Sequence, residues 1–305
     1  MNQFLPNLFI LGAARCGTTS LHSYLAGIPG ICMSNPKEPF FFECEYQRGL
    51  DHYQKTYFAH WKGEGIIGEA RHRNLYLPYV PERIHRVNPN AKLLVILRNP
   101  IDRAYSHWWL LYYNKREKLK FPEAIEEDYE RIQKGFRCET PEEIEQYCKN
   151  LGFDGSTTKG HGIYRTYLDT GYYYEQISRY TKIFPVNQLK VILLEDLLKD
   201  PRKIIGEICQ FLGLADVTTD KNFRFKKENE KETALFRNVS GVYGSSGLRA
   251  LLPNWLRKGG RKLIDWIGRD PGMDSETREW LRVHYFAQNR ALERFLKRDL
   301  SHWNL

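Results

Sequence analysis

Residues 8–21 read LFILGAARCGTTSL, an apolar run that leads into a glycine turn and then a helix start. Gly12 and Gly17 have the G-x-x-x-x-G spacing of a Walker A loop, whose backbone N–H groups surround a phosphate. The lysine that follows the second glycine in such a loop is replaced here by Thr18, and the positive charge of the loop is at Arg15. The stretch therefore predicts a site for a phosphate-like anion that is not the γ-phosphate of ATP.

The helix start after Gly17 offers more donors to the same anion. The N–H groups of Thr18 and Thr19 point toward a ligand at a helix N-terminus, where the helix dipole favours negative charge, and their hydroxyls donate as well. Cys16 and Ser20 belong to the same candidate anion-binding loop. The alternative is an ordinary strand-turn-helix corner with threonine capping, which the glycine spacing alone does not exclude.

A second strand-to-helix turn stands at residues 92–107, KLLVILRNPIDRAYSH. Ligands of open parallel sheets bind outside the carboxyl ends of the strands, so Arg98 at this strand end is a candidate anion ligand. Ser106 follows about two helical turns later and reaches the same phosphate if the helix folds back. An arginine at a strand end can instead make a surface ion pair.

Apolar runs rich in β-branched residues alternate with segments of helical spacing along the chain. The runs are at 8–12, 65–68, 92–97 and 189–194. This alternation predicts an α/β fold with a central parallel sheet flanked by helices. Helices are predicted at Val80–Val87, Pro100–Tyr113, Pro253–Ile267 and Ser275–Leu300.

The stretch around residues 114–160 is charged, with Pro122 and Pro141 each placed to open a short helix. It predicts a helical insertion outside the sheet, which either covers a cleft or is simply solvated. We expect residues 1–305 to form a single domain that includes this insertion.

The composition bounds the partners and the location. The formal net charge of +9 suits an anionic ligand, but the basic residues are scattered and no nucleic-acid module accompanies them, so we expect no nucleic-acid partner. No apolar run approaches the ~20 residues of a membrane span, and no secretory signal precedes the first strand. These features predict a cytoplasmic protein.

The six cysteines include no C-x-x-C pair set against paired histidines, so we expect no zinc site. Cys138 and Cys148 bracket a charged segment. They either pair in an oxidising compartment or remain reduced thiols.

Together, LGAARCGTTSL and LRNPIDRAYSHWW resemble the 5′-phosphosulfate loop and the 3′-phosphate site of the PAPS-dependent sulfotransferase family. The segment SNPKEPFFFE at 34–43, the residues Gly68-Glu69-Ala70 and the tail 274–303 are similar to its heparan sulfate and bacterial carbohydrate-type branch. The resemblance implies a P-loop-like sulfotransferase fold. It also implies sulfuryl transfer from PAPS (3′-phosphoadenosine 5′-phosphosulfate) to an acceptor hydroxyl or amine by in-line displacement, with release of PAP and without a metal.

The resemblance also assigns roles on the donor side. Thr18 and Thr19 would hold the 5′-phosphosulfate, and Arg98 with Ser106 the 3′-phosphate. Arg15 would neutralise the bridging oxygen of the leaving group, and not protonate it, because the pKa of a guanidinium is too high for acid catalysis.

On the acceptor side, Glu38 matches the family position of the general base. The alternatives are that Glu38 is a surface carboxylate beside Lys37, or that a histidine is the base, with His52, His107 and His161 as candidates.

The acceptor is predicted only as a carbohydrate or a small molecule. Phe40 and Ala70 depart from the histidine and lysine usual in the glucosaminyl 3-O-sulfotransferases, so heparan sulfate itself is in doubt. Either Arg257-Lys258-Gly259-Gly260 or Gly268-Arg269 would close on the nucleotide. Aromatic residues that line a pocket or pack the core are Phe40–Phe42, Trp108, Trp109 and Tyr172–Tyr174.

Other functional classes remain open from the sequence. A P-loop kinase or NTPase would need the missing lysine and an acidic strand end. A catalytically inactive protein that binds a nucleotide or a sulfated glycan would keep the loops without turnover. A nucleic-acid binder would use the positive charge and bind in a salt-sensitive way.

Overall fold

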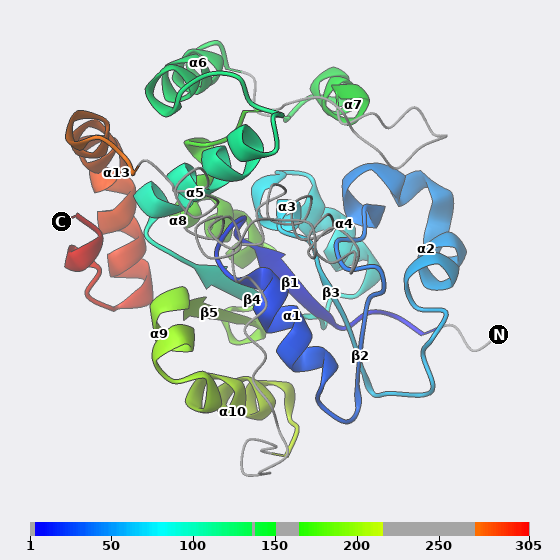
Figure 1. The fold of residues 1–305 in the computed structure, drawn as a ribbon. Helices are drawn as coiled ribbons and strands as arrows, with labels where there is room; N and C mark the ends of the chain where they lie inside the picture. The colour runs from blue at the N-terminus through cyan, green and yellow to red at the C-terminus, as the bar shows by residue number, and fades with distance from the viewer. Residues whose placement is uncertain (1–3, 136–137, 151–164, 216–271, 305) are drawn as a thin grey trace, which may run out of the picture.

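The computed structural model of the chain describes residues 4–135, 138–150, 165–215 and 272–304. Within these residues, five parallel strands form one sheet in the order β2-β3-β1-β4-β5 (Figure 1). The strands are β1 (Leu8–Gly12), β2 (Ile31–Met33), β3 (Ile66–Ala70), β4 (Lys92–Leu97) and β5 (Leu189–Leu193). The predicted α/β class with a central parallel sheet is confirmed. The sequence pattern missed β2, because a strand of three residues is too short to show a period.

The centre of the sheet is the pair β1 and β4, whose residues Leu8–Leu11 and Leu93–Leu97 are fully buried. On its other side β1 pairs with β3. The chain thus adds β2 and β3 on one side of β1 and β4 and β5 on the other, and the strand order reverses between β1 and β4. Ligands of open parallel sheets bind at the carboxyl ends of the strands where this reversal occurs. The loops that follow β1 and β4 therefore lie next to each other at the favoured ligand position of the fold.

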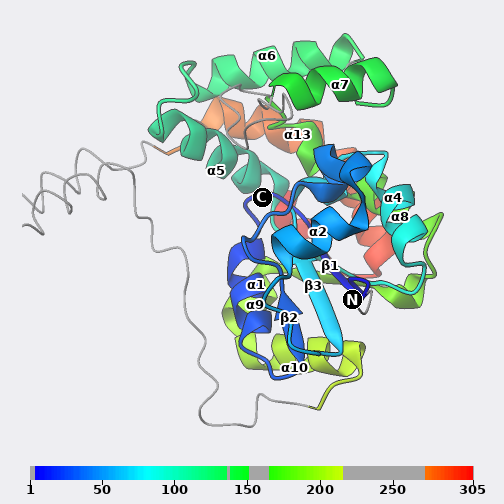
Figure 2. The ribbon, with the colours of Figure 1, turned by 90° about the vertical axis from the view of Figure 1, so that its right-hand side faces the viewer.

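Helices cover both faces of the sheet. Figure 2 shows α1 (Thr18–Ala26) and α9 (Leu194–Lys199) on one side of the strands, and α4 (Val80–Val87) and α8 (Tyr173–Thr181) on the other. The predicted bounds of α4 and of α5 (Pro100–Tyr113) agree with the structure. The last long helix, α13 (Ser275–Leu296), ends before Leu300, because Lys297 adopts the left-handed conformation that stops a helix. The helices outside the insertion are α1 (Thr18–Ala26), α2 (Gly49–Tyr57), α3 (Arg73–Tyr76), α4 (Val80–Val87), α5 (Pro100–Tyr113), α8 (Tyr173–Thr181), α9 (Leu194–Lys199), α10 (Pro201–Leu212) and α13 (Ser275–Leu296).

The charged insertion contributes α6 (Phe121–Gln133) and α7 (Pro141–Asn150). Pro122 lies in the first turn of α6, and Pro141 is the first residue of α7, as predicted. Both helices lie outside the sheet, at the opposite end of the molecule from α10 (Figures 1 and 2). Residues 151–164 and the predicted helix at 253–267 lie outside the described residues. The single-domain organisation of 1–305 stays a prediction.

Most of the aromatic residues considered for a pocket are core residues. Phe41, Phe42, Trp108 and Tyr173 are at most 4% exposed. Of the two interpretations, core packing holds for these four: Phe41, Phe42 and Tyr173 belong to the core around the sheet, and Trp108 packs against Phe121 of α6 in a second cluster.

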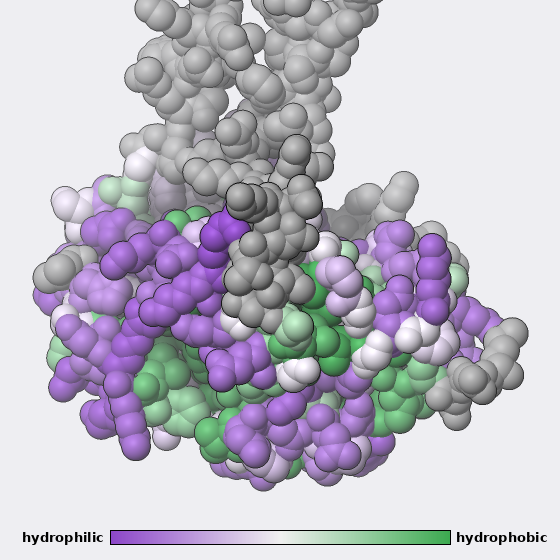
Figure 3. All heavy atoms as spheres, turned by 90° about the horizontal axis from the view of Figure 1, so that it is seen from below, coloured by the Kyte–Doolittle hydropathy of each residue, from purple (hydrophilic) through white to green (hydrophobic). Residues whose placement is uncertain are grey.

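The face seen in Figure 3 is largely hydrophilic, with smaller hydrophobic areas between the polar side chains. No helix in the described part of the chain is long and apolar enough to cross a membrane.

Candidate active site

The loop after β1 brings Arg15 against α5. Arg15 has a φ of 67°, and its Nε donates to Ser106 Oγ at 3.2 Å. Gly17 has a φ of 95°, and a Cβ there would lie 2.9 Å from Leu194 Cδ1, so this turn requires glycine. α1 then begins at Thr18, which is buried. The loop therefore presents a helix N-terminus and a guanidinium at the carboxyl end of the sheet.

Arg98 follows β4 and adds a second positive charge beside Arg15. Partial desolvation by the loop and repulsion from Arg98 both lower the pKa of Arg15. Among residues 4–135, 138–150, 165–215 and 272–304, no carboxylate pairs with either guanidinium. The end of β4 is held in place by Tyr173, whose hydroxyl donates to the Arg98 carbonyl at 2.9 Å. Two neighbouring arginines without an acidic partner attract an anionic ligand.

The start of α5 explains how Ser106 reaches the loop. The Asn99 side chain caps the helix by accepting a hydrogen bond from the Ile101 N–H at 3.0 Å, and Pro100 occupies the first turn. The direction of α5 is thereby fixed at the end of β4. Ser106 consequently faces the loop after β1, where its hydroxyl accepts the hydrogen bond from Arg15.

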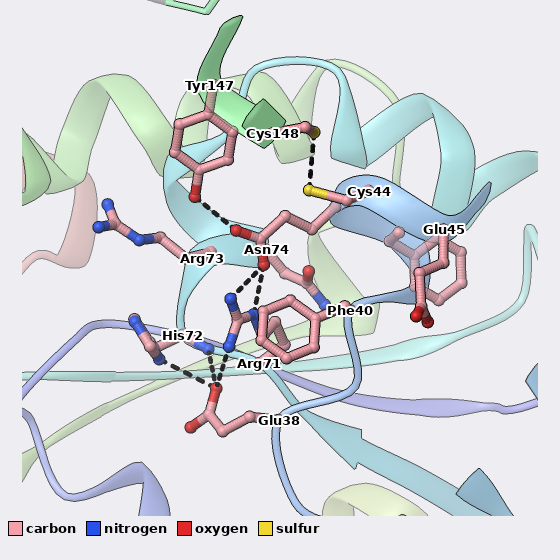
Figure 4. Close-up of polar contacts among 12 residues, drawn as sticks. Glu38, Phe40, Cys44, Glu45, Arg71, His72, Arg73, Asn74, Tyr147 and Cys148 are labelled. Atoms are coloured by element: carbon pink, nitrogen blue, oxygen red, sulfur yellow. Dashed lines mark hydrogen bonds and ion pairs between the residues drawn. The ribbon is translucent and has the colours of Figure 1, made fainter. Parts of the chain in front are cut away.

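Glu38 lies beside the end of β3, in a short network of charged groups. Its N–H donates to the Ala70 carbonyl at 3.1 Å. Its carboxylate accepts from the His72 N–H at 3.1 Å and from His72 Nδ1 at 2.9 Å, and lies 3.5 Å from Arg71 (Figure 4). Lys37 pairs with the other carboxylate oxygen. Glu38 is therefore beside Lys37, as the alternative assumed, but it is also bound to residues that follow β3.

These neighbours set the charge states of Glu38 and His72. Burial raises the pKa of Glu38, but His72, Arg71 and Lys37 outweigh it and hold that pKa well below its usual range. Burial lowers the pKa of the His72 ring more than Glu38 raises it. At neutral pH, a neutral His72 thus donates from Nδ1 to an ionised Glu38. No described side chain bonds Nε2 of His72, which remains an acceptor.

His72 was not among the histidines that the sequence offered as candidate bases. The apolar run was expected to end at residue 68, whereas β3 continues to Ala70 and delivers His72 to the edge of the site. Of those candidates, His107 is buried in α5, where burial and Arg103 hold its pKa well below the usual range. His52 lies in α2 with Nε2 3.5 Å from Glu45 Oε2. His161, Arg257–Gly260 and Arg269 lie outside the described residues.

Arg71 connects Glu38 to a second carboxylate, Glu43. Arg71 Nε donates to Glu43 Oε2 at 2.5 Å, and the Tyr147 hydroxyl of α7 donates to Oε1 of the same carboxylate (Figure 4). The Phe40 ring lies 4.1 Å from the Arg71 guanidinium. Because Glu43 is fully buried, this pairing fixes Arg71 and, through it, the position of Glu38.

The two halves of the site adjoin each other. A Cβ on Gly12, the first glycine of the loop, would lie 2.9 Å from the His72 carbonyl. The Arg71 N–H donates to the Ile10 carbonyl at 3.2 Å. The loop after β1 therefore lies beside His72, which follows the neighbouring strand β3 and pairs with Glu38.

Comparison with known proteins identifies the family of this chain. Residues 5–249 match the family model described as Sulfotransferase domain. The chain belongs to the sulfotransferase family. A crystal structure of a sulfotransferase from Alicyclobacillus acidocaldarius is similar to this fold, with a TM-score of 0.67 and 27% identity, over 98% of this chain and 99% of that one. The predicted P-loop-like sulfotransferase fold is confirmed.

Two curated relatives of this sulfotransferase are longer proteins. The membrane-associated sulfotransferase kil1 of Dictyostelium discoideum is 24% identical over 87% of this chain and 66% of its own length. The bifunctional heparan sulfate N-deacetylase/N-sulfotransferase 3 of Homo sapiens is 26% identical over 96% of this chain and 30% of its own length. The chain thus spans less than two thirds of the length of either relative.

Proposed function

We propose that this sulfotransferase moves a sulfuryl group from PAPS to a hydroxyl or amine of a carbohydrate or small-molecule acceptor and releases PAP. The observation that carries the proposal is the pair Arg15 and Arg98, side by side at the switch point of the sheet, without a carboxylate partner among the described residues. PAPS presents two anionic groups, the 5′-phosphosulfate and the 3′-phosphate. Two cations next to a helix N-terminus fit such a donor.

On this proposal, the backbone and hydroxyls of residues 16–20 bind the 5′-phosphosulfate, with Thr18 and Thr19 at the helix start. Arg98 and Ser106 bind the 3′-phosphate. The hydrogen bond between Arg15 and Ser106 supports a position of Arg15 between the two groups. The family membership supports PAPS as the donor.

Arg15 then stabilises the reaction by charge. As the acceptor atom bonds to sulfur, the bond from sulfur to the bridging phosphate oxygen breaks, and negative charge develops on the leaving phosphate. A preorganised guanidinium neutralises that charge without protonating it. Catalysis of this kind depends mostly on positioning, as in phosphoryl transfer.

Glu38 and His72 accept the proton that the acceptor loses. Glu38 takes it directly, or His72 takes it on Nε2 while Glu38 stabilises the ring through Nδ1. The low pKa of Glu38 makes its carboxylate a weak base, which favours the route through the ring.

The test is transfer of ³⁵S-sulfuryl from PAPS to a panel of acceptors that includes an oligosaccharide with unsubstituted glucosamine, simple sugars and phenols. We expect labelled product and PAP in equal amounts with at least one acceptor class. Binding of PAP without transfer to any class would favour the inactive binding protein. Hydrolysis of ATP at a rate above that of transfer would favour the NTPase.

A further inference from the structure

Cys44 and Cys148 lie opposite each other, although 104 residues separate them in the chain. Cys44 is in η1 (Phe41–Glu45), the π-helical turn that precedes α2, and Cys148 is in α7. Their Sγ atoms are 2.7 Å apart (Figure 4). A disulfide requires about 2.05 Å, so a small side-chain movement brings the two sulfurs to bonding distance.

Hydrogen bonds made by neighbouring residues hold η1 and α7, the segments that carry the two thiols, in fixed positions relative to each other. Glu43, which precedes Cys44, accepts a hydrogen bond from Tyr147, which precedes Cys148. Arg83 of α4 donates to the Glu43 carbonyl at 3.1 Å, and Tyr79 donates to it at 3.0 Å. The two thiols are therefore held opposite each other by the hydrogen bonds of the surrounding residues, and not only by the rotamers of the two cysteines.

The pair also differs from the other cysteines in accessibility. Cys44 and Cys148 are partly exposed, whereas Cys16, Cys32, Cys138 and Cys209 are buried. The hydrogen bond between the thiols lowers the pKa of Cys148 and raises that of Cys44, so Cys148 is the first to become a thiolate. A thiolate that is accessible is the reactive form of cysteine.

We propose that Cys44 and Cys148 are a redox modification site, which a small-molecule disulfide such as oxidised glutathione converts into a reversible disulfide that fastens α7 to η1. The Cys148 thiolate attacks one sulfur of oxidised glutathione and releases the first glutathione thiolate. Cys44 then loses its proton and attacks the Cys148 sulfur of the mixed disulfide, which releases the second. Two protein thiols are oxidised and one glutathione disulfide is reduced to two thiols.

The cross-link acts on the acceptor side of the site. Glu43 holds Arg71, and Arg71 lies against Glu38, so a bond between Cys44 and Cys148 restrains the helix and the turn that meet at this network. The inference concerns these two thiols alone and does not depend on the proposed function.

The test maps the disulfide in the full chain. The reduced protein is incubated with oxidised glutathione, free thiols are blocked with N-ethylmaleimide, and a tryptic digest without reduction is analysed by mass spectrometry. We expect the peptide 38–48 linked to the peptide 138–149, with dithiothreitol reversing the link. Because the second peptide also contains Cys138, the variant Cys138→Ser is the matched control and should retain the link, whereas Cys148→Ser should lose it.

Stability provides a second readout. Oxidation should raise the Tm of the wild type and of Cys138→Ser by roughly 5 °C or more, because the closed loop is long. It should leave the Tm of Cys148→Ser unchanged. Six N-ethylmaleimide adducts when the oxidised protein is labelled in denaturant, a stable glutathione adduct without a cross-link, or a bond between Cys138 and Cys148 inside one peptide would each overturn the proposal.

Discussion

Around the carboxyl ends of β1 and β4, Arg15 and Arg98 lie near each other, and neither has a carboxylate partner within the described ranges. Around the end of β3, by contrast, Arg71 pairs with the buried Glu43, and Glu38 is held by His72. An excess of positive charge is unfavourable until an anion compensates it, whereas paired charges stabilise one another's positions. In the proposed function, the first region binds the anionic donor through its charge, and the second region positions the proton acceptor.

The largest effect is expected on the rate of transfer. Glu38→Gln keeps the shape of the side chain but removes its charge and its capacity to take or stabilise a proton. We expect the rate to fall by about 10²–10⁴-fold with unchanged PAP affinity. Label transfer from PAPS and calorimetry with PAP measure the two quantities.

The control for this variant is Glu82→Gln, because Glu82 is exposed on α4. It should leave both quantities unchanged. A Glu38→Gln protein with full activity would remove Glu38 from the chemistry and leave it as a structural partner of His72.

A stability measurement sharpens the claim that the β3 region is internally paired. Glu43→Gln leaves the buried Arg71 guanidinium without its main partner and should cost about 3–5 kcal/mol of unfolding free energy. Urea denaturation measures it. A loss of less than about 0.5 kcal/mol, the range of an ordinary surface substitution, would contradict the pairing.

The unpaired region makes a prediction about ligand binding. Arg98→Ala should weaken PAP binding by about 10–100-fold, the effect of losing one or two hydrogen bonds to a charged group. ADP lacks the 3′-phosphate, so its affinity should not change. An equal loss for PAP and ADP would place Arg98 at the 5′ end and not at the 3′-phosphate.

The smallest effect is the position of the acid limb in the pH dependence of kcat/KM. Proton acceptance requires the deprotonated group, so activity falls as the pH falls through its pKa. Burial, Arg71 and Arg73 lower the pKa of His72, and the charge of Glu38 and its hydrogen bond to the ring oppose this lowering. An acid limb of kcat/KM with a midpoint below pH 6.5 that is absent from the His72→Gln variant supports proton acceptance by the His72 ring. A limb that stays below pH 4.5 in both proteins supports Glu38 alone.

The proximity of Arg15 and Arg98 could be predicted from the sequence because its signals are local, whereas the binding of an anion there stays a prediction. The glycine spacing of the loop and the arginine after β4 are each contained in one strand-to-helix turn, and the sheet order then brings Arg15 and Arg98 together.

The β3 region depends on contacts between distant segments, and its details were therefore missed. His72 was missed because the apolar run ends at residue 68, whereas β3 continues for two more residues, to Ala70, and places His72 beside Glu38. The sequence left open whether Cys138 and Cys148 pair or remain reduced thiols, and it did not point to Cys44. The hydrogen bond between Tyr147 and Glu43 places Cys148 opposite Cys44.

The most direct test of the account is the thermal stability of the purified protein with PAP, ATP, ADP and 3′-AMP at equal concentrations. A ligand at ~100 times its dissociation constant adds about 2.7 kcal/mol, which gives a clear increase in Tm. The account predicts a larger increase with PAP than with any of the others, because PAP carries both anionic groups that Arg15 and Arg98 are proposed to bind. An equal increase with ATP, or no increase with PAP, would contradict it.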